Sequence, residues 1–106
     1  MNHNFTRDIC LHLVLPQSLE ESVIDLLLAH PDWVGPFLTQ PADGHAAPEH
    51  IGSEAERVRG RAQRIKFEIL MAHDATPPLL TELQAKLPGA NIAWWISPVL
   101  DSGSLT

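Results

Sequence analysis

The sequence predicts one α+β domain in which the elements follow the order strand, helix, strand, strand, helix, strand. Three observations support this prediction. Segments with a two-residue apolar period lie near the start, in the middle and near the end of the chain. Two segments with a helical apolar period lie between them. A long stretch without periodicity separates the second strand from the third. This order is that of the ferredoxin-like βαββαβ fold, a four-stranded antiparallel sheet with two helices on one face.

The first strand and first helix are indicated by residues 9–30. Apolar residues alternate over 9–15 (ICLHLVL), and Pro16 is expected to end the strand. Ser18 followed three residues later by Glu21 matches a capping box and predicts that a helix starts there.

The second strand is expected over 33–40 (WVGPFLTQ). Gly35 and Pro36 weaken its strand composition and predict a bulge or an edge position. The segment 41–57 is rich in Ala, Pro, Gly and His, and it predicts a long loop. Loops of this length are often functional.

The second half repeats the pattern of strand, helix and strand. A strand is expected over 65–72 (IKFEILMA), and a helix capped by Thr76 follows it. The last strand is expected over 91–99, and the polar tail 101–106 is expected to fray. The whole chain, 1–106, is therefore expected to be a single domain.

Composition narrows the class of protein. The chain has 106 residues, 44% of them hydrophobic, and a net charge of −6. Such a balance opposes nonspecific binding to nucleic acid or to anionic membranes. Cys10 is the only cysteine, which fits a reducing compartment, and the apolar run 9–15 is too short for a membrane span. We therefore expect a cytoplasmic protein that does not insert into a membrane and does not bind nucleic acid.

Both faces of the predicted sheet carry apolar side chains. The helix-covered face is expected to present the residues Ile9, Leu11, Leu13, Ile65, Phe67, Ile69, Ile92, Trp94 and Ile96. The opposite face is expected to present Cys10, His12, Val14, Leu70, Ala72, Ala93 and Trp95. An apolar patch of this kind predicts a homo-oligomer packed through its sheets, with Cys10, His12, Val14, Leu70 and Trp95 at the interface.

Positive charge is concentrated in one segment. Five of the seven Lys and Arg residues are Arg57, Arg59, Arg61, Arg64 and Lys66. Guanidinium groups hold carboxylates or phosphates bidentately. Two interpretations stay open: ion pairing with internal or intersubunit carboxylates such as Glu68, or a site for a small anion or nucleotide phosphate. Nucleic acid is disfavoured, because no aromatic residues interleave with these charges.

The segment DGHAAPEH supplies Asp43, His45, Glu49 and His50 within eight residues. Imidazole and carboxylate suit a divalent transition metal, although no helix presets the spacing here. A solvated loop is the alternative. Cys10 and His12 form a second pair, two residues apart on one strand face. They could hold a soft ion such as Cu(I), whereas simple packing is the plainer interpretation.

Several short segments resemble a known group of proteins. They are Leu15-Pro16 after the first strand, Asp43-Gly44-His45, Val58-Arg59-Gly60-Arg61, Arg64-Ile65-Lys66-Phe67, and Trp95 with Ser97-Pro98-Val99-Leu100 and Gly103. Together they resemble an uncharacterised family of PII-like proteins, within the superfamily of the PII signal transducers and the CutA proteins, whose genes accompany heavy-metal efflux pumps of the RND type. The glycine-rich nucleotide-binding segment of PII proteins has no counterpart here.

The resemblance implies a trimer with its sheets facing inward, and a regulatory loop, the T-loop of PII proteins, at 41–57. It implies regulated binding and signalling, with a membrane efflux transporter as the candidate partner. The effector stays open between a metal ion and a small molecule. The alternative function is a CutA-like metal buffer or chaperone without signalling. Catalysis finds little support, because Cys10 and His12 alone are not an activated nucleophile, which needs a third, orienting group; a small enzyme is the third and weaker option.

Overall fold

The computed structural model describes residues 7–45 and 61–106 and confirms the predicted α+β fold. The elements are β1 (Ile9–Pro16), η1 (Gln17–Leu19), α1 (Glu20–Leu28), β2 (Val34–His45), β3 (Arg61–Met71), η3 (His73–Ala75), α3 (Thr76–Lys86) and β4 (Ala93–Pro98). The four strands form one antiparallel sheet in the order β2-β3-β1-β4. This is the ferredoxin-like arrangement, in which the two halves of the chain interleave.

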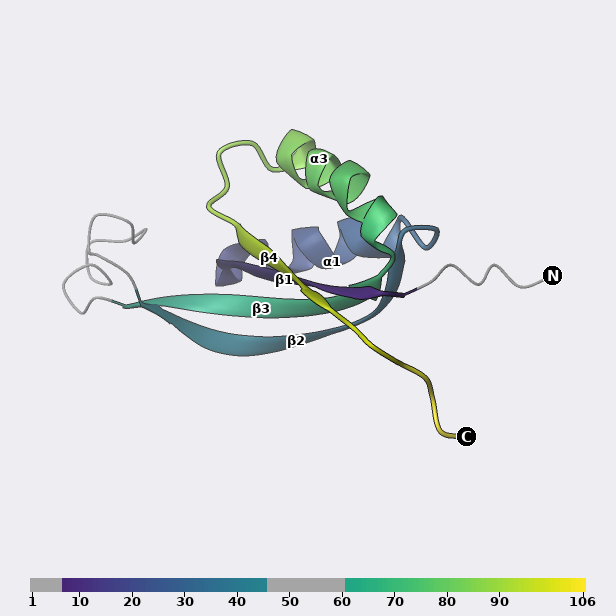
Figure 1. The fold of residues 1–106 in the computed structure, drawn as a ribbon. Coiled ribbons are helices and arrows are strands. Elements are labelled where there is room, and N and C mark those ends of the chain that lie inside the picture. Colours follow the sequence, from purple (N-terminus) through teal and green to yellow (C-terminus); the bar gives the residue numbers. More distant parts are fainter. Residues whose placement is uncertain (1–6, 46–60) are drawn as a thin grey trace.

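The two helices lie on the same side of the sheet, as Figure 1 shows. We call the other side, over which no described helix lies, the open face. The far ends of β2 and β3 extend beyond the helices, toward the segment 46–60, which is outside the described residues (Figure 1). That segment contains most of the predicted loop 41–57.

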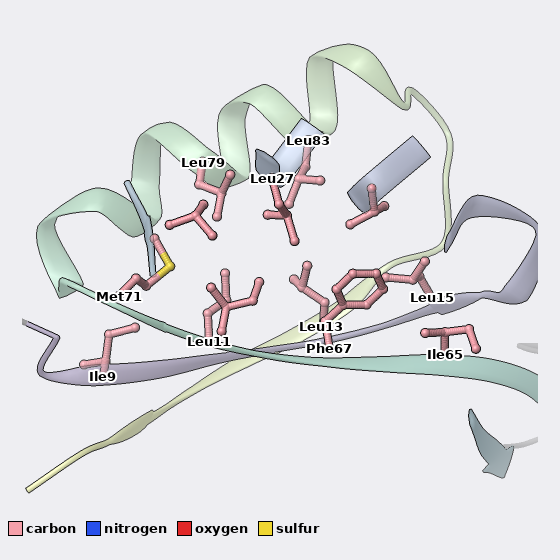
Figure 2. Packing of buried hydrophobic residues seen from close by; sticks show 13 residues of the cluster. Ile9, Leu11, Leu13, Leu15, Leu27, Ile65, Phe67, Met71, Leu79 and Leu83 are labelled. Atoms are coloured by element: carbon pink, nitrogen blue, oxygen red, sulfur yellow. The ribbon is translucent and has the colours of Figure 1, made fainter. Parts of the chain in front are cut away.

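The core lies between the helices and the sheet. Leu11 and Leu13 of β1 and Phe67 of β3 are fully buried there, and Leu27, Leu79 and Leu83 of the helices point toward them (Figure 2). Alternation in β1 is complete, since each odd-numbered residue is buried and each even-numbered one is partly exposed. The two-residue period thus places one set of side chains in the core and the other on the open face.

Both helices begin differently from the prediction. The short 3₁₀ turn η1 precedes α1, whose N-cap is Leu19, and no side chain caps it, so the capping box of Ser18 and Glu21 is wrong. The N-cap of α3 is Ala75. Thr76 is instead the first helical residue, and its hydroxyl donates a hydrogen bond of 2.7 Å to the carbonyl oxygen of His73. The proline-led start of α3 is as expected.

The predicted irregularity of β2 is confirmed. Its register with β3 shifts between Val34 and Phe37, and β2 is an edge strand. A Cβ added to Gly35 would lie 2.3 Å from the carbonyl oxygen of Leu70, so the bulge brings two backbones closer than any side chain allows. β2 also continues through Pro41 to His45, which corrects the expectation that the loop begins at residue 41.

Neither helix of the described chain is long and apolar enough to cross a membrane.

Candidate functional site

The open face carries a row of four side chains that come from all four strands. His12 of β1 lies opposite Glu68 of β3 on one side and opposite Trp95 of β4 on the other. Leu38 of β2 lies opposite Glu68. Because facing residues in antiparallel strands point to the same side of the sheet, Leu38, Glu68, His12 and Trp95 form one continuous row. We call these residues the central row.

His12 is the most constrained member of the central row. Its Nε2 lies 2.9 Å from Oγ of Ser97, and its ring stacks on Trp95 with 5.2 Å between centroids and 11° between planes. Its Nδ1 faces Oε2 of Glu68 at 3.8 Å, which is too long for a hydrogen bond. Nδ1 is buried and has no hydrogen-bond partner among the described residues. A buried polar atom in this position costs about 1–3 kcal/mol.

Glu68 also faces a cation. Nζ of Lys66 lies 3.8 Å from the same Oε2 atom, and it lies 5.9 Å from the centre of the Trp95 ring. Lys66 is one of the five clustered cationic residues, and its compensating carboxylate is internal. This contact agrees with the ion-pairing interpretation of the cationic cluster, but only for Lys66.

Cys10 lies on the open face between Leu70 of β3 and Ser97 of β4. Burial raises the pKa of the Cys10 thiol above 9.0, and the nearby Glu68 carboxylate raises it further, while a backbone hydrogen bond from Ile69 and the charge of Lys66 act in the opposite direction. A thiol with a raised pKa is a poor nucleophile at neutral pH, because the thiolate is the reactive form. The Cys10 sulfur, a His12 nitrogen and a Glu68 oxygen all lie within 4.8 Å of one another.

The residues predicted for the oligomer interface share the open face. Val14 and Leu70, like Cys10 and His12, are partly buried there. Trp95 is 46% exposed, and Leu38 at the edge is 71% exposed. The open face therefore combines exposed and partly buried apolar side chains with the polar residues His12 and Glu68. Its role as an interface stays a prediction.

Trp94 is on the helix-covered face, as predicted, but it is not buried in the core. Its side chain is 52% exposed. It lines a groove of ≈ 630 Å³ between α3 and β4, together with Leu80, Leu87 and Ile92. β4 is an edge strand, so the indole of Trp94 lies at the border of the core.

The clustered arginines are only partly within the described chain. Arg57 and Arg59 lie outside it, and of Arg61 only the backbone, at the start of β3, is described. Arg64 lies opposite Ala42 and Pro16, on the same face as Lys66. Together with Asp43 it lines a shallow hollow of ≈ 230 Å³. The anion site stays a prediction.

The four predicted metal ligands of the segment DGHAAPEH are also only partly within the described chain. Asp43 and His45 belong to β2, where they are two residues apart and therefore on one face. Both are exposed. Glu49 and His50 lie outside the described residues, so the four-residue metal site stays a prediction.

The sequence did not predict that Glu68 and Ser97 contact His12, although Glu68 was named as a candidate partner for the cationic cluster. Both contact His12 from other strands, at separations of 56 and 85 residues along the chain. The two-residue period placed Glu68 on the open face, but only the strand register pairs it with His12. From the sequence, the contact between Glu68 and His12 could have been predicted only by assuming a register between β1 and β3.

Comparisons with known proteins identify the family of this chain and solved structures with a similar fold. The model of the family described as "Protein of unknown function (DUF3240)" matches residues 5–106. The chain belongs to this family. No curated protein sequence matches the chain. The crystal structure of a DUF3240 family protein from Shewanella baltica superposes with a TM-score of 0.75 at 20% identity, covering 96% of this chain and 100% of that one.

PII-like proteins are also structurally similar. CPII from Thiomonas intermedia, a nitrogen regulatory PII-like protein solved with ADP, AMP and bicarbonate, has a TM-score of 0.68 at 16% identity, with 92% of this chain and 96% of that chain covered. A putative PII-like signalling protein from Thermus thermophilus has a TM-score of 0.61 at 16% identity, with coverage of 87% and 86%. At these identities the likeness establishes the fold.

Proposed function

We propose that this chain is a PII-like regulatory binding protein that works in the cytoplasm as a homo-oligomer, binding an effector without turning it over. The observation that supports this most directly is the likeness of the whole fold to two PII-like proteins, one of them described as signalling and one as nitrogen regulatory. The length of β2 and β3 adds support, because these strands reach beyond the helices and lead into the segment that we propose to be a T-loop.

The oligomer is proposed to be a trimer whose open faces turn inward. Half-exposed Trp95 and partly buried Val14 and Leu70 give each copy an apolar surface to bury. In the central row, Nε2 of His12 already has Oγ of Ser97 as a hydrogen-bond partner, whereas Nδ1 has none among the described residues. Association through this face would remove the indole of Trp95 from water.

The effector is proposed to be a metal ion or a small anion that changes the order of the segment between β2 and β3. An effector shifts this equilibrium only if it binds one loop state more tightly than the other. CPII was solved with ADP, AMP and bicarbonate. Here Arg64 and Lys66 supply positive charge on one face, and a metal-efflux transporter is the proposed partner.

The test combines binding and capture. Calorimetry and thermal melting should reveal a ligand among Zn²⁺, Co²⁺, Ni²⁺, Cu⁺, ADP, AMP and bicarbonate, and a pulldown with and without that ligand should capture the transporter in only one condition. If no ligand binds more tightly than high micromolar, or if capture does not depend on the ligand, regulation by an effector is refuted.

A metal buffer without a signalling role is the second candidate. The convergence of a thiol, an imidazole and a carboxylate on the open face favours it. A buffer would bind metal stoichiometrically and would capture no partner in either condition, so the same pulldown separates the two functions.

A further inference from the structure

We propose that Cys10, His12 and Glu68 form a binding site for one borderline divalent transition ion, such as Zn²⁺, in each chain. That this ion is the effector rests on the proposed function; the site itself is built by a single chain and stands independently of it. The loop donors Asp43, His45, Glu49 and His50 take no part.

The separation of the three donors suits a tetrahedral ion. Bonds of about 2.0–2.3 Å to nitrogen, oxygen and sulfur place the ligand atoms of a tetrahedron roughly 3.3–3.8 Å apart. His12 Nδ1 and Glu68 Oε2 are 3.8 Å apart, and all three donor atoms lie within 4.8 Å of one another. Rotation of the Glu68 and Cys10 side chains would bring the three donor atoms to these separations without a shift of the strands.

The surroundings of His12 orient it for this task. A neutral imidazole carries one N–H, and when Nε2–H donates to Oγ of Ser97, Nδ1 presents its lone pair to the Glu68 carboxylate. Two acceptors then face each other across 3.8 Å, and the buried nitrogen has no donor among the described residues. A cation between them satisfies both. The contact between His12 and Ser97 is the kind of outer hydrogen bond that orients metal-bound histidines.

The chemistry of the donors selects the ion. Sulfur and imidazole disfavour Mg²⁺ and Ca²⁺, which take oxygen ligands. The carboxylate favours a borderline divalent ion over Cu⁺. Three protein ligands leave the fourth tetrahedral position to water or an external donor.

Lys66 is the group that competes with the ion, because its Nζ contacts the same Glu68 oxygen at 3.8 Å. The ammonium also lies 5.9 Å from the centre of the Trp95 ring. Cation–π attraction can hold it there when Glu68 turns to a metal ion. The ion therefore does not leave Lys66 without a partner.

The test is a Co²⁺ titration of the full reduced chain, followed by displacement with Zn²⁺. Cys10 is the only cysteine, so a thiolate-to-cobalt charge-transfer band can come from no other residue. We expect this band to saturate at one Co²⁺ per chain and to vanish on adding Zn²⁺. A folded chain that binds Co²⁺ without the band, or that binds none, overturns the proposal.

Variants locate the other two ligands. We expect Glu68→Gln and His12→Gln to weaken Co²⁺ binding at least ten-fold, and Ser97→Ala to weaken it roughly ten-fold through the lost orientation of His12. His30→Gln is the matched control, because His30 also faces a glutamate, Glu82 at 3.1 Å, but no thiol. Each variant is first checked for a cooperative thermal transition. If His12→Gln folds and binds as well as the parent, the site is refuted.

Three further outcomes separate this site from its rivals. If the double variant His45→Gln/His50→Gln abolishes binding while Cys10→Ala leaves it intact, the ion sits at the loop and the proposal fails. If the cobalt band appears as expected but Zn²⁺ does not alter partner capture, the site stands and the regulatory function fails. If a nucleotide controls capture of the partner and no cobalt band appears, the metal site is refuted but the proposed regulatory function stands.

Discussion

Replacing Trp95 by alanine should dissociate the proposed oligomer. Trp95 is 46% exposed in the single chain. A tryptophan offers up to about 250 Å² for burial, so roughly 115 Å² of Trp95 becomes buried if the open face is covered. At about 25 cal/mol per Å² this contributes about 3 kcal/mol for each copy.

A loss of about 3 kcal/mol corresponds to roughly a hundred-fold weaker association. The assay is sedimentation equilibrium or light scattering after size exclusion, over a series of protein concentrations. The parent chain should remain associated at concentrations at which Trp95→Ala is a single copy. Thermal melting of the dissociated variant checks that the chain still folds after losing the stack on His12.

Trp94→Ala is the matched control. Trp94 is the next residue in the chain and 52% exposed, but it lies on the helix side of the sheet. It should therefore leave association unchanged. The reasoning is refuted if the parent is a folded single copy at all concentrations, if Trp95→Ala associates as tightly as the parent, or if Trp94→Ala dissociates to the same extent.

Three further predictions concern the described core and Cys10. Burial and Glu68 raise the pKa of the Cys10 thiol, so the folded state favours the neutral thiol. The resulting contribution to the free energy of unfolding is present below pH 9.0 and is lost as the pH rises through the folded-state pKa. Urea unfolding of the metal-free chain from pH 7 to 10 should show this loss, and Cys10→Ala should make the free energy of unfolding less dependent on pH. Gly35→Ala places a Cβ 2.3 Å from the Leu70 carbonyl oxygen, so urea unfolding should show a loss of about 1–3 kcal/mol, whereas Gly103→Ala, which meets nothing within 4 Å, should be neutral. Phe67→Ala removes a fully buried ring and should cost about 3–5 kcal/mol in the same assay; an unchanged midpoint would contradict the core assignment.

The open face shows what strand periodicity alone can and cannot predict. Alternation in β1 correctly separated buried Leu11 and Leu13 from Cys10 and His12 on the opposite side. It could not show that Glu68 and Ser97 converge on His12, because these partners come from strands 56 and 85 residues away. Pairing between strands depends on register, and register is set by the packing of the whole sheet.

Errors at the element ends have a similar origin. Ser18 and Glu21 have the spacing of a capping box, but the 3₁₀ turn η1 carries the chain from β1 into α1 and displaces the helix start to Glu20. Short 3₁₀ turns are common at the ends of α-helices, and they shift the first α-helical residue away from the position that a local pattern predicts. β2 likewise continues to His45 because β3 offers it a partner as far as Arg61.

By itself the sequence determined the class of fold, the order of the elements, the two faces of β1 and the concentration of positive charge, because these follow from short-range periodicity and composition. Only the tertiary structure decided that Trp94 stays at the border of the core and that thiol, imidazole and carboxylate meet on the open face. The physical reason is that strand order and register bring together side chains that no local pattern connects.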